Sequence, residues 1–283
     1  MATPFHPGFE LDLDGAARLA RWLVGQGNEA LVLSGTTGEA PTLSDAEKLD
    51  LWAAVAEAVT VPVIAGCGTN DTAHSVALAS SAKEVGAAGI LAVTPYYNRP
   101  SQVGIEAHFR AVAESTDLPV LLYDIPVRTG RRIEFPTLVK LLGEVGNIVG
   151  VKDASGDVAR AARLVATVPS ADLYSGDDSL TLALLAAGAA GVIGVATHWA
   201  AGLFGEMIEA FSKGDPAKAA AANAKLFDSY SFESSEVAPN PIPTKVMLEA
   251  LGLPGGPTRP PMGPVPPGLL ETAESVLAAL ARA

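Results

Sequence analysis

The stretch NIVGVKDASGD, from Asn147 to Asp157, places a lysine directly after an apolar strand. Ile148 and Val151 are β-branched and favour a strand that is buried on both faces. Lys152 follows at once, although an ammonium group is rarely placed next to a core. Two interpretations are open for this lysine. Either its ammonium reaches water at the end of the strand, or its amine is desolvated and acts as a nucleophile.

On both sides of this stretch, short apolar runs alternate with longer runs that have the three-to-four-residue spacing of amphipathic helices. Regular alternation of strands with helices predicts a parallel sheet. We expect seven strands, over Ala30–Leu33, Pro62–Ala65, Gly89–Val93, Pro119–Tyr123, Asn147–Val151, Asp172–Tyr174 and Gly191–Val195.

An eighth strand would close the sheet into a (β/α)8 barrel, and the candidate is the opening MATPF, ahead of a helix over Asp14–Gly25. Alternation alone does not separate a barrel from an open doubly wound sheet. The motif G-x-G-x-x-G follows none of the strands, which disfavours a dinucleotide-binding sheet.

The strand pattern stops near Gly214. Residues 1–214 are therefore predicted to form the barrel, and residues 215–283 a C-terminal helical region. Three helices are expected there, within PAKAAAANAKLFDSY, IPTKVMLEALGL and GLLETAESVLAALARA. A Pro-rich loop, Pro254–Gly268, separates the last two, and we expect it to run extended along the surface.

Composition narrows the classes of function. The 283 residues carry a net charge of −12, which disfavours nucleic-acid and anionic-membrane partners because both need clustered Lys and Arg. Cys67 is the single cysteine, so no internal disulfide forms.

The first residues lack the features of a signal peptide, and we expect a cytoplasmic protein. The uncharged run Ser179–Gly205 is long enough to span a bilayer, but its glycines divide it into helix, strand and helix.

Polar residues follow several of the strands at ends that would meet on one rim of a barrel. In GTTGE, Gly35–Glu39, flexible glycines and the hydroxyls of Thr36 and Thr37 suit a carboxylate, although an ordinary turn has the same composition. Tyr123 is either a core aromatic or a rim hydroxyl. Arg128 is either solvated or grips a carboxylate with its planar fork.

Metal chemistry is not indicated. The four histidines are scattered without the H-x-x-x-H spacing of a zinc site, and Asp177 and Asp178 suit a helix cap better than Mg²⁺. No cofactor is expected. Carbon–carbon bond chemistry would then need an amine as electron sink, which points again to Lys152.

Six motifs, in order along essentially the whole chain, resemble those of the dihydrodipicolinate synthase / N-acetylneuraminate lyase family of class I aldolases. They are GTTGE (Gly35–Glu39), VTPYYNRPSQ (Val93–Gln102), LYDIPVRTG (Leu122–Gly130), GVKDASGD (Gly150–Asp157), SGDD (Ser175–Asp178) and PNPIPTK (Pro239–Lys245). The resemblance implies a (β/α)8 TIM barrel with a C-terminal three-helix appendage, and a homotetramer built from tight dimers.

The resemblance also implies a catalytic set of four residues. Lys152 forms a Schiff base with pyruvate, and Tyr123 relays protons beside it. Thr36 connects Tyr123 by hydrogen bonds to Tyr97, which reaches into the neighbouring subunit's site of the tight dimer.

The implied substrate-binding residues are Thr37, Arg128, Ile193 and Gly176. Thr37 and the adjacent backbone hold the pyruvate carboxylate, and the Ile193 carbonyl lies near the imine carbon. Arg128 resembles the residue that binds the aldehyde's carboxylate in the synthase branch, which implies condensation of pyruvate with aspartate semialdehyde in lysine biosynthesis. Another pyruvate-dependent aldolase, or a pyruvate-binding member without turnover, remains the alternative.

The chemistry of a Schiff base explains these residue types. Burial beside the core favours a neutral lysine amine, which can attack a ketone. The iminium makes the methyl group of pyruvate acidic, and the enamine that forms attacks the aldehyde. Asp153 would favour the charged ammonium if it faced Lys152, so we expect it to point away, toward backbone donors.

Two departures from the family pattern are visible. Only Met1 and Ala2 precede Thr3, so we expect a very short first strand or a start codon that was assigned late. At the place where many synthases bind the inhibitor lysine, Lys48 would repel that ligand, and we expect weak or absent lysine feedback.

Overall fold

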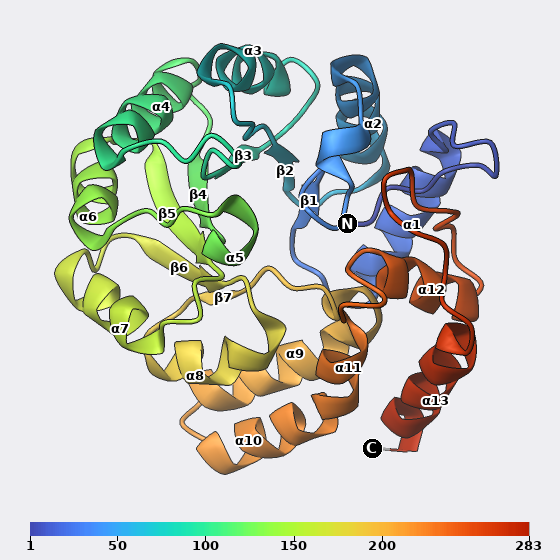
Figure 1. Cartoon of the computed structure of the whole chain (residues 1–283). Coiled ribbons are helices and arrows are strands. Elements are labelled where there is room, and N and C mark those ends of the chain that lie inside the picture. The colour runs from blue at the N-terminus through green and yellow to red at the C-terminus, as the bar shows by residue number, and fades with distance from the viewer. Residues whose placement is uncertain (283) are drawn as a thin grey trace. The chain divides into compact units, whose positions relative to one another are not determined.

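Strands alternate with helices along most of the chain in the computed structural model, which describes residues 1–282 (Figure 1). The chain divides into two compact units. The sheet unit is Ile64–Ile193, and the terminal unit combines Met1–Val63 with the residues from Gly194 onward.

A parallel sheet forms the centre of the sheet unit, and each strand pairs with the next one along the chain. Ile148 and Val151 of the opening stretch are 3% and 0% exposed, as their β-branched side chains predict. Each predicted strand is present to within three residues at either end. The strands are β2 (Val63–Gly66), β3 (Gly89–Val93), β4 (Val120–Asp124), β5 (Ile148–Asp153), β6 (Asp172–Ser175) and β7 (Gly191–Val192).

The longer helices between its strands cover the outer side of this sheet, whereas the one-turn α5 (Pro126–Thr129) lies on the inner side of that layer (Figure 1). Polar side chains cap the first turn of three of them, the helices that begin at Thr72, Gln102 and Val158. Asp71 accepts hydrogen bonds from the N–H groups of Ala73 and His74 at 2.8 and 3.3 Å, which satisfies donors that the first turn leaves open. The helices are α3 (Thr72–Ala82), α4 (Gln102–Glu114), α5 (Pro126–Thr129), α6 (Phe135–Glu144), α7 (Val158–Thr167) and α8 (Thr181–Ala186).

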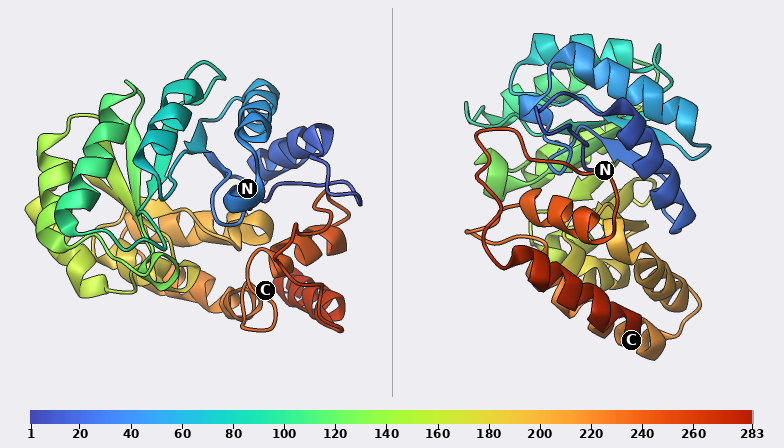
Figure 2. Two further views of the ribbon diagram at one scale, coloured as in Figure 1. Left: turned by 45° about the horizontal axis from the view of Figure 1, so that its top comes forward. Right: turned by 90° about the vertical axis from the view of Figure 1, so that its right-hand side faces the viewer.

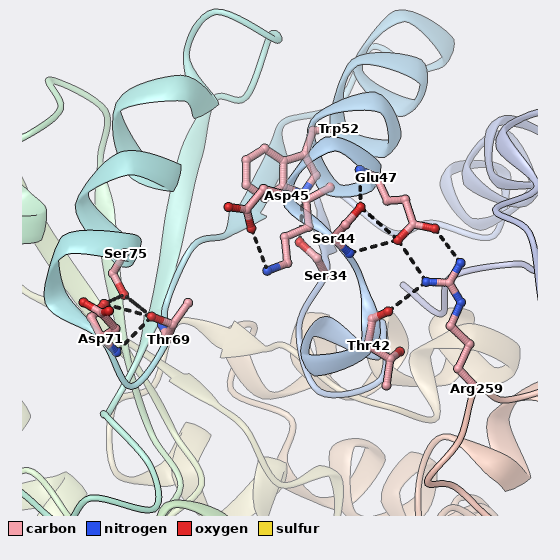
Figure 3. Close-up of polar contacts among 11 residues, drawn as sticks. Ser34, Thr42, Ser44, Asp45, Glu47, Trp52, Thr69, Asp71, Ser75 and Arg259 are labelled. Atoms are coloured by element: carbon pink, nitrogen blue, oxygen red, sulfur yellow. Dashed lines mark hydrogen bonds and ion pairs between the residues drawn. The ribbon is translucent and has the colours of Figure 1, made fainter.

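The terminal unit holds the short strand β1 (Leu31–Leu33) and the remaining helices. α1 packs against α2, α9 against α10, and α12 against α13 (Figure 2). Ser44 and Glu47 form the predicted capping box at the start of α2, with Ser44 Oγ accepting from Glu47 N (Figure 3). The helices are α1 (Leu13–Gly25), α2 (Asp45–Ala58), α9 (Thr197–Ser212), α10 (Pro216–Lys225), α11 (Phe227–Phe232), α12 (Ile242–Ala250) and α13 (Leu269–Arg282).

The opening MATPF is not a strand, which corrects the expectation for residues 1–5. Phe5 makes an isolated antiparallel bridge with Leu11, and the chain turns between them. The Met1 amino group donates to the Val32 carbonyl at 2.5 Å, so the segment still lies beside β1. Pro4 cannot donate a backbone hydrogen bond, which limits any ladder here.

Four helices, rather than the predicted three, follow Gly214 within residues 1–282. The first predicted helix divides at Leu226, which ends α10 and begins α11. The Pro-rich loop 254–268 has no helix or strand, as expected. None of the helices within residues 1–282 combines the length and the apolar character that a bilayer span needs, and the uncharged run forms several short elements instead.

Candidate active site

Lys152 and Tyr123 lie side by side at the carboxyl ends of two neighbouring strands of the sheet unit. β4 and β5 pair in a register that sets Tyr123 opposite Lys152. The Lys152 Nζ lies 4.4 Å from the centroid of the Tyr123 ring. Tyr123 is 4% exposed and Lys152 is half-buried. The amine therefore rests on the aromatic ring of a buried phenol.

The side chain of Lys152 also passes close to Gly176. Gly176 follows β6, and its N–H donates to the Asp153 carbonyl at 2.7 Å. A Cβ atom at this position would lie 3.0 Å from both Cγ and Cε of Lys152 and 3.0 Å from the Ala154 Cβ. The side chain of Lys152 thus runs directly past the bare α-carbon, and a glycine leaves it room.

Asp153 points away from Lys152, which confirms the expectation. Its Oδ1 accepts a hydrogen bond from the Ser155 N–H at 2.7 Å, and its Oδ2 lies 3.6 Å from Arg160 Nη1. Asp124, opposite Asp153 on β4, is fully buried. Burial raises the pKa of Asp124 to about 6, although the Arg160 guanidinium acts in the opposite direction.

The remaining predicted residues of the sheet unit lie on its loops. Tyr97, after β3, is 90% exposed and has a φ of 71°, a conformation that is uncommon for a residue with a side chain. Arg128 lies exposed on the one-turn helix α5, between Pro126 and Gly130. The Ile193 N–H donates to the Ser175 carbonyl at 2.8 Å, just beyond β7.

Thr36 and Thr37 belong to the terminal unit, in the loop that follows β1. Thr37 Oγ1 accepts a hydrogen bond from Asn240 Nδ2 at 2.9 Å, and Asn240 Oδ1 accepts from Thr244 Oγ1 at 2.9 Å. The motif PNPIPTK therefore orients the hydroxyl of Thr37. A Cβ at Gly38 would lie 2.9 Å from the Ser34 nitrogen, so the loop needs glycine there. The hydrogen-bond chain from Thr36 to Tyr123 and Tyr97 stays a prediction.

Buried charges anchor the same loop at Glu39, which has a φ of 55° and is 3% exposed. Lys245 Nζ lies 2.6 Å from Glu39 Oε1, and the Arg259 N–H donates to Glu39 Oε2 at 2.8 Å. Burial lowers the pKa of Lys245, and the Glu39 carboxylate opposes that effect. Arg259 continues the network to Glu47 of the capping box and to the Thr42 carbonyl (Figure 3).

Comparison with known proteins identifies the family to which this chain belongs. A model described as the dihydrodipicolinate synthetase family matches residues 1–280. The chain belongs to the dihydrodipicolinate synthetase family.

Named members of the dihydrodipicolinate synthetase family are similar to this chain over nearly their full length. The 4-hydroxy-tetrahydrodipicolinate synthase of Moorella thermoacetica is 48% identical over 265 residues, which cover 93% of this chain and 90% of that protein. The dihydrodipicolinate synthase structure from Bacillus anthracis has a TM-score of 0.94 and 40% identity, covering 98% of this chain and 95% of that one. The structure from Cyanidioschyzon merolae, with lysine bound, has a TM-score of 0.96 and 39% identity, covering 99% and 96%. This similarity confirms the predicted barrel with C-terminal helices.

Three polar residues of this family member were not assigned a role from the sequence. Asn240 and Lys245 fall in the motif PNPIPTK, whose letters indicate no function for them, and only the structure shows their bonds to Thr37 and Glu39. Arg160 has the sequence context of an exposed helical arginine, yet its side chain is 9% exposed. Within residues 1–282, no group of three or more His, Cys, Asp or Glu side chains is arranged to hold a metal ion.

Proposed function

We propose that this protein is a 4-hydroxy-tetrahydrodipicolinate synthase, which condenses pyruvate with aspartate semialdehyde through a Schiff base on Lys152. The observation that carries the proposal is the Lys152 Nζ held 4.4 Å from the ring centroid of the buried Tyr123, at the carboxyl end of β5. Barrel enzymes place their chemistry at these strand ends. The family relatives named above carry this activity in their names. A solved relative from Acinetobacter baumannii, 34% identical, is described as complexed with pyruvate.

The reaction begins when the Lys152 amine adds to the ketone carbon of pyruvate. Loss of water leaves a protonated imine, whose positive nitrogen withdraws electrons from the neighbouring methyl group. A proton leaves that methyl group, and the enamine attacks the aldehyde carbon to form the new carbon–carbon bond. The ring of Tyr123 lies beside the nitrogen, and in this proposal its hydroxyl relays the protons. The amino group of the condensed aspartate semialdehyde then adds to the imine carbon, and cleavage of the bond from that carbon to Nζ closes the ring of the product and returns the free Lys152 amine.

The carboxylates of the two substrates need separate partners. Thr37 and the neighbouring backbone hold that of pyruvate, and the Asn240 donor keeps the Thr37 hydroxyl free to donate its own hydrogen. The planar fork of Arg128 suits the carboxylate of aspartate semialdehyde. Ile193 and Gly176 border the imine. Tyr97, which is 90% exposed in the single chain, completes the site of a second subunit within a tetramer built from tight dimers.

The division into residues 1–214 and 215–283, like the cytoplasmic location, stays a prediction. The second candidate function is that of an aldolase that joins pyruvate to another aldehyde. We favour aspartate semialdehyde over other aldehydes because Arg128 suits its carboxylate. A pyruvate-binding protein without turnover is disfavoured by the activity named for the relatives.

A substrate panel tests the proposal. The purified protein is assayed with pyruvate and aspartate semialdehyde, and in parallel with sugar-acid and aromatic aldehydes. We expect turnover with aspartate semialdehyde and none with Lys152→Arg. Arg128→Ala should raise the KM for the aldehyde and leave the KM for pyruvate unchanged. Arg128→Lys should recover only part of the lost affinity for the aldehyde. Full aldehyde affinity in Arg128→Ala, or turnover confined to another aldehyde, contradicts the assignment.

A further inference from the structure

A buried cluster of two carboxylates and one guanidinium lies one residue beyond the proposed catalytic pair. Arg160, in the first turn of α7, places Nη1 3.1 Å from Asp124 Oδ2 and 3.6 Å from Asp153 Oδ2. The side chains of the three residues are 9%, 0% and 3% exposed. None of them takes part in the chemistry proposed above.

The cluster is tied to the catalytic pair by strand geometry. Asp124 follows Tyr123 on β4, Asp153 follows Lys152 on β5, and the register pairs the two aspartates just as it pairs the tyrosine with the lysine. Successive side chains of a strand point to opposite faces of the sheet. Arg160 therefore holds the two strand ends together from the outer face, directly behind the groups that lie together on the inner face.

The positive guanidinium of Arg160 offsets the repulsion between the carboxylates of Asp124 and Asp153. Two carboxylates directly opposite each other on neighbouring strands repel, and burial strengthens that repulsion. Without Arg160 the ends of β4 and β5 would carry this repulsion where Tyr123 and Lys152 must stay in contact. A separation of the strand ends would increase the distance from amine to phenol.

The same cluster anchors the loop that carries Arg128. Asp124 Oδ1 accepts a hydrogen bond from the Ile133 N–H at 3.1 Å, and Arg160 Nη2 donates to the Ile133 carbonyl. Ile133 is fully buried and lies just after the loop. Both backbone groups of the residue that closes this loop are thus bound by the cluster.

We propose that Arg160 is a positioning residue for the reaction: through Asp124 and Asp153 it fixes the separation of Tyr123 and Lys152, and through Ile133 it fixes the loop that carries Arg128. The inference rests on the proposed function, since it assigns Arg160 a part in that reaction. It predicts that removing the guanidinium affects two separate steps, formation of the Schiff base and binding of the aldehyde.

The test compares Arg160→Met with the matched control Arg163→Met. Arg163 lies on the same helix, is exposed, and packs its guanidinium 4.2 Å from the ring centroid of Phe135. Each variant is incubated with saturating pyruvate and borohydride, and the rate of covalent trapping per folded protein is measured well below the melting temperature. In Arg160→Met we expect trapping to slow by about 10- to 100-fold, because a misplacement of about 1 Å can slow an enzyme by about 100-fold. We also expect a raised KM for the aldehyde. Arg163→Met should match wild type in both.

Further variants keep the inference testable if Arg160→Met folds poorly. Arg160→Lys retains the charge and should trap faster than Arg160→Met. The double variant Asp124→Asn, Arg160→Met removes the repulsion and keeps the acceptor for Ile133, so it should recover part of the lost rate.

Wild-type rates and wild-type KM values in a folded Arg160 variant would overturn this inference alone. A lower melting temperature with an unchanged trapping rate would overturn it as well, because that is the signature of a purely structural role. Absence of trapping in wild type would overturn the proposed function and this inference together.

Discussion

Replacing Gly176 with alanine tests how closely the structure controls the position of Lys152. The new Cβ would lie 3.0 Å from Cγ and Cε of Lys152 and from the Ala154 Cβ. Carbon atoms pack at about 3.5–4.0 Å, so the lysine side chain must move by about half an ångström or more. Such overpacking costs about 1–3 kcal/mol of stability. A misplacement of about 1 Å can slow an enzyme about 100-fold. The smaller shift expected in Gly176→Ala should therefore lower the rate of Schiff-base trapping about tenfold.

The assay is the rate at which pyruvate and borohydride inactivate the enzyme at saturating pyruvate. Gly143→Ala is the matched control, because Gly143 lies in α6 and a Cβ there would meet no atom within 4 Å. That substitution should leave the trapping rate unchanged and stabilise the helix by up to about 1 kcal/mol. If Gly176→Ala traps pyruvate as fast as wild type, the reasoning that this glycine sets the path of Lys152 is refuted.

Three further predictions concern stability and regulation. Burial raises the pKa of Asp124 from 3.8 to about 6, so the folded protein binds the extra proton and the free energy of unfolding should fall by about 3 kcal/mol as pH rises through that interval. Unfolding by urea at several pH values should show this dependence in wild type but not in Asp124→Asn. Lys245→Met leaves Glu39 charged and buried, which should cost about 3–5 kcal/mol in urea unfolding, and adding Glu39→Gln should recover part of that cost. Free lysine at micromolar concentration should not lower the initial rate, because the family resemblance places the inhibitor beside Lys48, whose ammonium would repel a cationic ligand there; micromolar inhibition would contradict this.

The alternating strands and helices could be predicted because each depends on local sequence. β-Branched runs such as Ile148–Val151 form strands, and the Ser44 capping box fixes a helix start. The break at Leu226 could not be predicted, because its φ and ψ of −91° and −6° remain close to helical and no glycine or proline marks it.

The site was predictable only in part. The strand-end position of Lys152 followed from the residues, whereas the roles of Thr36, Tyr97 and Arg128 came from family resemblance. Arg160 could not be found in this way, because its partners come from two strands and no local pattern distinguishes it from a solvated helical arginine.

Mass mapping of the reduced pyruvate adduct tests the central claim most directly. The protein is incubated with pyruvate and borohydride, digested, and searched for the peptide that carries a reduced pyruvyl group. We predict that the modification lies on Lys152 and disappears in Lys152→Arg. Modification of a different lysine, or none at all, would contradict the account.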